Sequence, residues 1–244
     1  MKQWSKRLAA VLIYYVVAFC GFWILYQFGI DYAGDKIHIY AIPMMIVLCG
    51  YVFVINKKRI FQKKDFTFCP ENAGLNLIPY VAALGVAVTW IEAIVRNMFA
   101  IDLLFITILT FLIGIGEEGM FRKYLLDGEE KTFVGKIGLF VFSVVTFSLL
   151  HMMNVAGGLT VTGAWIQSLS AVPFGIVAGI LYWKTKNLSA LIFWHMMVDY
   201  FLFISVCGTF YSPSVLGLGM DVILISALIR IVYQEIKSRI ARNK

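Results

Sequence analysis

The sequence predicts an all-α fold: a polytopic membrane helix bundle of about eight transmembrane helices with both termini in the cytoplasm. Of the 244 residues, 61% are hydrophobic and only 14% are charged, whereas an average soluble domain has about 25% charged residues. Apolar runs recur along the chain, each near the roughly 17–25 residues that a helix needs to cross the hydrocarbon layer. These runs are continuous, and a transmembrane barrel would instead alternate apolar and polar residues. The observations therefore exclude a soluble globular domain and a barrel.

Eight apolar runs mark the expected spans. They are Leu8–Phe28, Ile37–Ile55, Leu75–Val95, Phe99–Gly116, Ile137–Met153, Ala164–Trp183, Leu188–Cys207 and Val215–Tyr233. The first run follows three basic residues and lacks a small-residue cleavage site, so we expect it to stay as a span and not to be removed as a signal peptide. No repeat or long linker divides the chain, which predicts a single transmembrane domain over residues 1–244. The prolines at 70, 79, 173 and 213 are expected at or near span ends.

The distribution of basic residues predicts the orientation of the spans. With a cytoplasmic amino terminus, all but two of the 21 Lys and Arg residues lie on the cytoplasmic side, and only Lys36 and Arg96 face outward. Positive residues favour cytoplasmic connections and bind anionic lipid headgroups. The net charge of +7 therefore indicates membrane topology and not nucleic-acid binding. The compact chain without targeting extensions favours a multi-pass protein of a bacterial plasma membrane.

The four cysteines do not form a ligand pattern. Cys20, Cys49, Cys69 and Cys207 are far apart and have no paired spacing. We interpret them as free thiols and not as a metal site.

Ionisable residues inside the spans form a short set, and each needs a partner or a function because charge is costly in the bilayer. Glu92 and Arg96 have the i, i+4 spacing of a helical ion pair with the acid first. Glu118 and Arg122 have the same spacing, which leaves the adjacent Glu117 for chemistry. A helix continuing to about Leu126 would hold all three. An acidic cap at the membrane surface is the structural alternative.

Two histidines favour a functional interpretation of this cluster. His151 lies in the fifth span and His195 in the seventh, where Asp199 follows on the same helical face and can orient the imidazole. Three spans that each carry ionisable side chains pack most readily when these side chains face one shared polar site inside the bundle. At 1.5 Å per residue, His195 lies about 11 Å and His151 about 20 Å from the cytoplasmic ends of their helices, which predicts a pocket below that surface. His38 is expected at the wet outer interface.

These segments resemble the CPBP family of intramembrane glutamic endopeptidases, also called the CAAX protease, bacteriocin-processing or Abi family. Its marks are Glu-Glu-x-x-x-Arg, Phe-x-x-x-His and His-x-x-x-Asn/Asp segments on three different transmembrane helices. Here they read Glu117 to Arg122, Phe147 to His151, and His195 to Asp199, in the family's order. The resemblance covers about residues 100–205, which would be the catalytic core.

The resemblance implies a role for each of these residues. Glu117 and His151 would polarise a water for attack on a peptide carbonyl, while His195 and Asp199 would stabilise or orient the developing oxyanion. Glu118, Arg122 and Phe147 would support the site. The chain departs from the family pattern at two positions: Lys123 replaces a frequent glycine, and Asp199 replaces the asparagine of many members. The negative charge of Asp199 makes an oxyanion site less favourable unless His195 is protonated.

No cofactor is expected, and zinc is the less favoured alternative, because a His-x-x-x-His or cysteine ligand pair is absent and Glu118 is expected to pair with Arg122. The leading hypothesis is an intramembrane endopeptidase that cleaves a peptide or a lipid-anchored protein tail from the cytoplasmic side. A non-catalytic adaptor or bacteriocin-immunity protein of the same fold is the first alternative. A transporter with a proton relay is the second, and repeated halves that would favour it are not evident.

Overall fold

The computed structural model describes residues 2–57, 65, 70–98, 101–127, 132–207, 210 and 212–242, and over these residues the chain is helical and has no strands. The α-helices are α1 (Lys2–Gln27), α2 (Ile37–Tyr40), α3 (Ile42–Ile55), α4 (Ile78–Val95), α5 (Asp102–Glu117), α6 (Phe133–Leu150), α7 (Val161–Thr185), α8 (Leu188–Ile204) and α9 (Ser212–Arg242). Short 3₁₀ segments adjoin three of them: η2 (Pro70–Leu77) before α4, η4 (His151–Gly157) after α6 and η5 (Ser205–Cys207) after α8. A π-helical segment, η3 (Glu118–Tyr124), continues α5.

The helices confirm the all-α membrane fold expected from the apolar runs. Seven helices of the described chain are long and apolar enough to cross a membrane. The remaining expected span, Leu188–Cys207, corresponds to α8, which has 17 helical residues and lies at the short limit for a transmembrane helix. Most of its side chains are buried by neighbouring helices, so α8 is an internal helix of the bundle.

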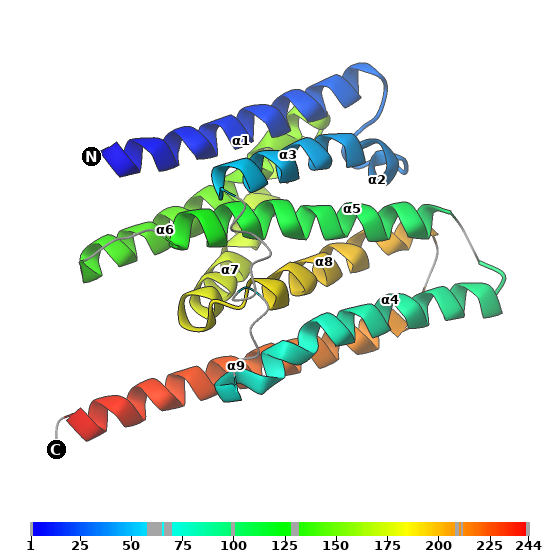
Figure 1. Ribbon diagram of the computed structural model, residues 1–244. Helices are drawn as coiled ribbons and strands as arrows, with labels where there is room; N and C mark the ends of the chain where they lie inside the picture. Colours follow the sequence, from blue (N-terminus) through cyan, green and yellow to red (C-terminus); the bar gives the residue numbers. More distant parts are fainter. Residues whose placement is uncertain are drawn as a thin grey trace.

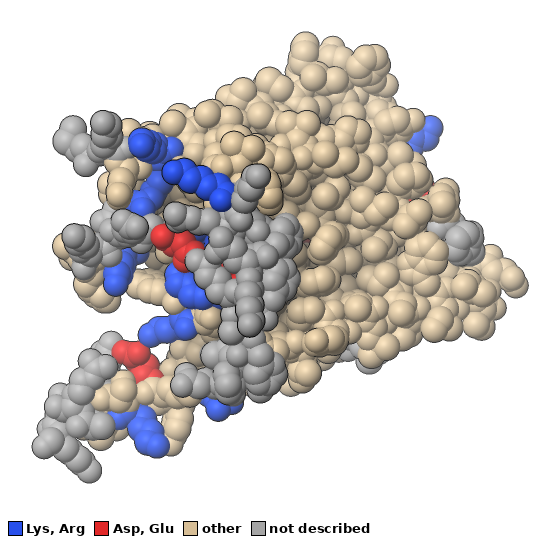
Figure 2. Space-filling view, viewed as in Figure 1, with Lys and Arg blue, Asp and Glu red and all other residues tan. Residues whose placement is uncertain are grey.

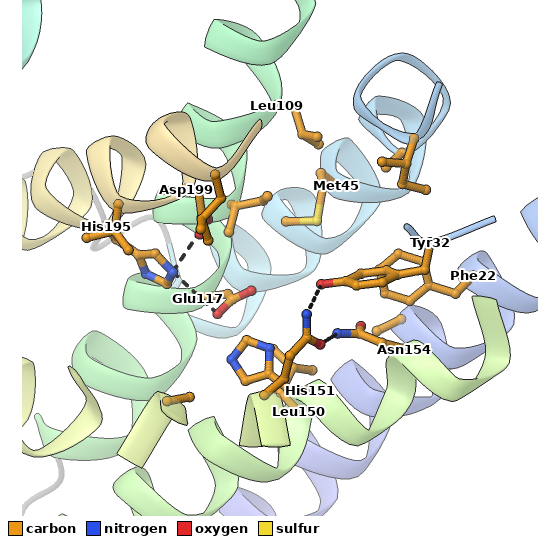
Figure 3. A pocket seen from close by; sticks show the side chains of 18 of the residues that line it. Phe22, Tyr32, Met45, Leu109, Glu117, Leu150, His151, Asn154, His195 and Asp199 are labelled. Carbon is orange, nitrogen blue, oxygen red and sulfur yellow. Dashed lines mark hydrogen bonds and ion pairs between the residues drawn. The ribbon is translucent and has the colours of Figure 1, made fainter. Parts of the chain in front are cut away.

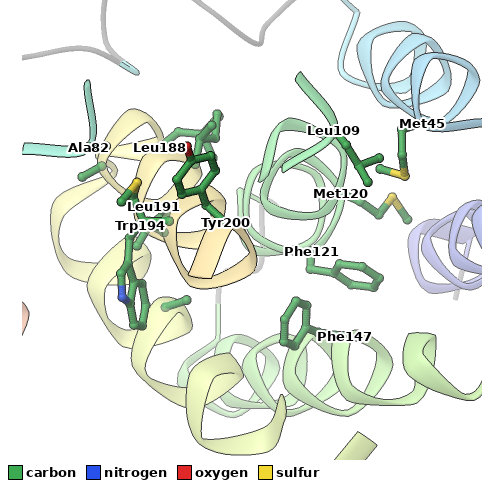
Figure 4. Packing of buried hydrophobic residues seen from close by; sticks show 14 of the residues in the cluster. Met45, Ala82, Leu109, Met120, Phe121, Phe147, Leu188, Leu191, Trp194 and Tyr200 are labelled. Carbon is green, nitrogen blue, oxygen red and sulfur yellow. The ribbon is translucent and has the colours of Figure 1, made fainter. Parts of the chain in front are cut away.

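Helices α5 and α8 form the centre of the bundle. In Figure 1, α1 and α3 lie on one side of this pair, and α4 and α9 lie on the other. Gly114 allows the two central helices to approach closely, because a Cβ there would come within 2.6 Å of the Ile192 carbonyl oxygen. Buried side chains fill the space around them, among them Leu109, Leu191 and Tyr200 (Figure 4).

The two ends of the bundle differ in charge. Both termini lie at the same end in Figure 1, and Lys and Arg side chains gather there in Figure 2. We call this the basic end and define it by five residues around one cavity: Lys6, Arg7, Lys57, Lys123 and Lys186. Cys20, Cys49 and Cys207 are free thiols, as expected. Several residues from the count of Lys and Arg, the set of cysteines and the fourth expected span lie outside the described residues: Lys58, Arg59, Lys63, Lys64, Cys69, Phe99, Lys131 and Lys244.

Two expectations, for His38 and Pro173, were wrong. His38 is not a wet interfacial residue: it is 1% exposed, and its Nε2 lies 2.8 Å from Asp102 Oδ1, because the short α2 folds over the start of α5. Pro173 lies inside α7 and not near a span end. Neighbouring helices allow an internal proline in a membrane helix.

The local ion pair expected in the third span is present. Arg96 Nη1 lies 2.9 Å from Glu92 Oε1 at the end of α4. This pair is therefore structural, as its spacing predicted.

Candidate active site

The Glu117–Glu118 pair lies where the central helix changes its geometry. α5 ends at Glu117 and continues as the π-helical segment Glu118–Tyr124, so the helix extends beyond Arg122 as expected but is wider than an α-helix. π-Helical turns are rare and are frequent at functional sites. Asn56, which directly follows α3, supports this turn by donating from Nδ2 to the Gly119 carbonyl, at 3.4 Å. The two adjacent carboxylates therefore have different surroundings: Glu117 lines the cavity, whereas Glu118 pairs with Arg122.

Glu118 forms the ion pair that its spacing predicted. Its Oε2 lies 3.1 Å from Arg122 Nε, and both side chains are 0% exposed. Arg122 Nη1 also donates to Ser143 Oγ at 3.4 Å, and its guanidinium lies 4.5 Å from the centroid of the Phe147 ring, a cation–π geometry. This arrangement joins η3 to α6.

His195 of α8 lies among three carboxylates. Its Nδ1 is 2.9 Å from Glu118 Oε1, while its Nε2 is 3.8 Å from Glu117 Oε2 and 3.7 Å from Asp199 Oδ2. The shortest contact is with Glu118, and the expected partner Asp199 is farther away. Glu118 therefore orients the imidazole, which leaves Nε2 directed towards Glu117 and Asp199.

His151 approaches the cluster from another side. It begins the 3₁₀ segment η4, directly after α6. Its ring packs edge-on against Phe147, with 5.9 Å between ring centroids, and Phe147 also contacts the His195 ring at 5.8 Å. Figure 3 shows Glu117 between the His195–Asp199 pair and His151. The structure thus brings together all four residues predicted to be catalytic, and places Phe147 between the two imidazoles.

A cavity of about 610 Å³ opens beside these residues. Glu117, His151, His195 and Asp199 line it, together with mostly apolar side chains from α1, α3, α5, α7 and α8. Glu117 is only 9% exposed. The cavity can hold a peptide segment in an apolar environment with the carboxylates and imidazoles at one place on its wall.

The cavity also contains a group of three hydrogen-bonded polar side chains that was not predicted from the sequence. Asn154 Nδ2 donates to Gln167 Oε1 at 2.8 Å, and Gln167 Nε2 donates to the Tyr32 hydroxyl at 3.3 Å. All three residues line the cavity, and Figure 3 shows Tyr32 and Asn154 there. The available signal was local: Asn154 follows His151 by three residues, and Gln167 is an isolated amide within an apolar run.

The central part of the chain matches a known protein family. Residues 98–201 match the Rce1-like family of type II CAAX prenyl endopeptidases. The family resemblance inferred from the three motifs is therefore confirmed. No significant match was found among curated proteins or solved structures.

The Rce1-like segment contains every site residue that the sequence predicted. It runs from before α5 to within α8 and includes the three motifs, but it covers less than half of the chain. Tyr32 and the cavity residues of α1 and α3 lie outside it. The chain is thus a multi-pass membrane protein with an Rce1-like CAAX protease segment, and its amino-terminal helices complete the cavity wall.

The residues of the site also bear on metal binding. Within the described ranges, no group of three or more His, Cys, Asp or Glu side chains is arranged to hold a metal ion. Glu118 already contacts Arg122 and His195.

Proposed function

We propose that this protein is an intramembrane endopeptidase that hydrolyses a peptide bond with a water activated by Glu117 and His151. The observation that carries the proposal is the placement of Glu117, His151, His195 and Asp199 around one cavity. The Rce1-like match supports the same class of reaction. The substrate would be a membrane-associated peptide or a lipid-anchored protein.

Glu117 is the proposed general base. Its carboxylate would take a proton from water as the water oxygen attacks the scissile carbonyl carbon, and His151 would hold that water from the opposite side. Collapse of the tetrahedral intermediate would break the C–N bond, with Glu117 returning the proton to the leaving nitrogen. General acid–base catalysis of this kind contributes about 10²–10⁴-fold to a rate.

His195 is the proposed donor to the oxyanion. When both ring nitrogens carry protons, Nδ1 donates to Glu118 and Nε2 is free to donate to a developing negative charge. Asp199, at 3.7 Å from Nε2, would favour the protonated ring. This role accounts for an aspartate at the position where many family members have asparagine.

The proposed reaction needs no metal. Zinc stays the alternative, in which Glu117 would be a ligand and not a base. The arrangement of the described side chains favours the metal-free reaction, since Glu118 is engaged by Arg122 and His195.

We also propose that the basic end lies in the cytoplasm, where its Lys and Arg side chains bind anionic lipids. The protein would then be a multi-pass protein of a bacterial plasma membrane. The sequence predicted that the substrate approaches from the cytoplasmic side, but the residues that line the cavity lie in the half of the bundle farther from the basic end.

The test compares the peptides released by membranes that contain the wild type, Glu117→Ala or His151→Ala. We expect peptides that are released by the wild type and lost in both variants at equal protein levels. Identical peptide sets from all three membranes would contradict the proposal and favour a non-catalytic adaptor or immunity protein of this fold.

A further inference from the structure

The catalytic cavity occupies only one half of the bundle. α1 starts at the basic end and contributes Tyr14, Ala18 and Phe22 to the cavity wall, all beyond its first three turns. α7 ends at the basic end and contributes residues only from Ile166 to Phe174. We call the half that holds the cavity the remote half, because it is the half farther from the basic end.

A layer of buried apolar side chains separates the cavity from the basic end. The layer consists of Val11 of α1, Val52 of α3 and Met120 of η3, which are 1%, 0% and 0% exposed. Val11 and Val52 lie three and four residues from the cavity residues Tyr14 and Leu48, on the same faces of α1 and α3. Met120 follows the cavity residue Glu117 by three residues. The layer therefore lies about one helical turn from the cavity floor.

Hydrogen bonds between helices hold this layer closed. The Tyr51 hydroxyl donates to the Ala10 carbonyl at 3.0 Å and joins α3 to α1. Asn56 joins α3 to η3 through the Gly119 carbonyl. On the other side of η3, the fully buried Glu118–Arg122 pair occupies the space next to Glu117, towards the basic end. Buried groups therefore surround the floor on several sides.

A separate polar cavity of about 520 Å³ lies beyond the layer. Its lining includes Arg7, Ile55 and Tyr124, each seven residues along its helix from Tyr14, Leu48 and Glu117 of the catalytic cavity. Seven residues are close to two turns of an α-helix, so the two cavities follow the same faces of α1 and α3. A substrate approaching from the basic end would meet this second cavity and then the apolar layer.

The exposed residues of the catalytic cavity mark its opening. Ile166 of α7 is 61% exposed and Leu202 of α8 is 69% exposed, and both line the cavity. Nearer the basic end the same two helices are closed together by Phe174 and Trp194, whose rings stack with centroids 4.3 Å apart. Ser170 and Ala33 are further exposed lining residues. The opening thus lies between α7 and α8 in the remote half.

We infer that the substrate reaches Glu117 through this opening, from the remote half of the membrane and not from the basic end. The inference rests on the proposed endopeptidase function and on a cytoplasmic basic end. It names the substrate class: an exported peptide at the outer leaflet, or a membrane protein whose cleaved bond lies in the outer half of the bilayer. A lipid-anchored tail held at the cytoplasmic surface does not fit this route.

The test is cysteine labelling of intact cells with a membrane-impermeant maleimide. The four native cysteines are first replaced by serine, and single cysteines are then introduced as Ser170→Cys in the cavity, Ala33→Cys at the remote end and Lys186→Cys at the basic end. We expect Ser170→Cys and Ala33→Cys to react in intact cells as completely as after permeabilisation. Lys186→Cys should react only after permeabilisation.

Three results would overturn the inference. These are reaction of Ser170→Cys only after permeabilisation, reaction of Ser170→Cys from neither side, and reaction of Lys186→Cys from outside. Labelling does not require proteolysis. An inactive protein with the expected labelling pattern would therefore refute the proposed function alone, whereas cleavage with the wrong pattern would refute the route alone.

Discussion

At the scale of single residues, Glu118 connects the structural and chemical parts of the site. One of its oxygens contacts Arg122 and the other contacts His195. Its removal would leave Arg122 unpaired at 0% exposure and His195 without its closest carboxylate. The site therefore does not divide into a structural Glu118 and a chemical Glu117 as cleanly as the sequence predicted.

Glu118→Ala is expected to lower both stability and activity. Breaking a buried ion pair costs about 3–5 kcal/mol, and the His195 ring loses the contact that orients it. Thermal unfolding in detergent and the rate of proteolysis measure the two effects. The matched control is Glu235→Ala, which removes the exposed Lys184–Glu235 pair at 3.0 Å and should change stability by at most about 1 kcal/mol. Equal behaviour of the two variants would show that Glu118 has no special role.

The residue scale also shows what a linear sequence can reveal. The Glu118–Arg122 contact was predictable because both residues lie on one helix at i, i+4 spacing. The Glu118–His195 contact joins residues 77 positions apart and depends on how α5 packs against α8. Motif spacing could not supply that packing, so the sequence assigned the orienting role to the local Asp199.

At the scale of elements, the approach of α5 to α8 fixes the distance between the carboxylates and His195. Gly114→Ala would place a Cβ 2.6 Å from the Ile192 carbonyl oxygen, a backbone atom that cannot move without shifting α8. Overpacking of this kind costs about 1–3 kcal/mol. We expect lower thermal stability together with reduced proteolysis, because His195 lies three residues after Ile192.

Gly50→Ala is the matched control for this prediction. Gly50 lies inside α3, and a Cβ there has no atom within 4 Å, so alanine should be neutral or slightly stabilising by its helix propensity. Equal unfolding temperatures for Gly114→Ala and Gly50→Ala would contradict the role given to the α5–α8 contact.

The helices themselves were predictable because long apolar runs have few other structures available in a bilayer. Their irregularities were not. The π-helical turn at Glu118 and the 3₁₀ segment at His151 depend on packing between helices, which periodicity does not encode. Pro173 showed the same limit, since neighbouring helices allow it inside α7.

At the scale of the whole molecule, charge distinguishes the two ends of the bundle. The orientation proposed from this asymmetry predicts that single cysteines replacing Lys63 and Lys186 react with an impermeant reagent only from the cytoplasmic side. Labelling of either position in intact cells would exclude eight spans with cytoplasmic termini. Lys63 lies outside the described residues, whereas Lys186 lies 2.8 Å from Asp127 at the end of the bundle.

Asp127 lies within reach of two lysines at the basic end, Lys123 and Lys186. Partial burial raises the pKa of Asp127, but the hydrogen bond and the charge of Lys186 outweigh it, so the pKa lies below its usual value. Asp127 therefore stays charged at neutral pH and holds Lys186 next to the polar cavity.

The metal-free reaction predicts that a strong chelator leaves proteolysis unchanged. Purified protein would be incubated with the chelator, and bound zinc and activity would be measured on the same sample. Stoichiometric zinc whose removal stops cleavage would show that Glu117 acts as a ligand.

The central claim is that Glu117 activates the water that cleaves the peptide bond. The most direct test is the cleavage rate of Glu117→Gln in proteoliposomes, with a peptide identified from wild-type membranes as the substrate. The amide keeps the volume of the side chain and removes its basicity, so we predict a rate lower by about 10²–10⁴-fold with an unchanged unfolding temperature. Cleavage by Glu117→Gln at the wild-type rate would contradict the claim.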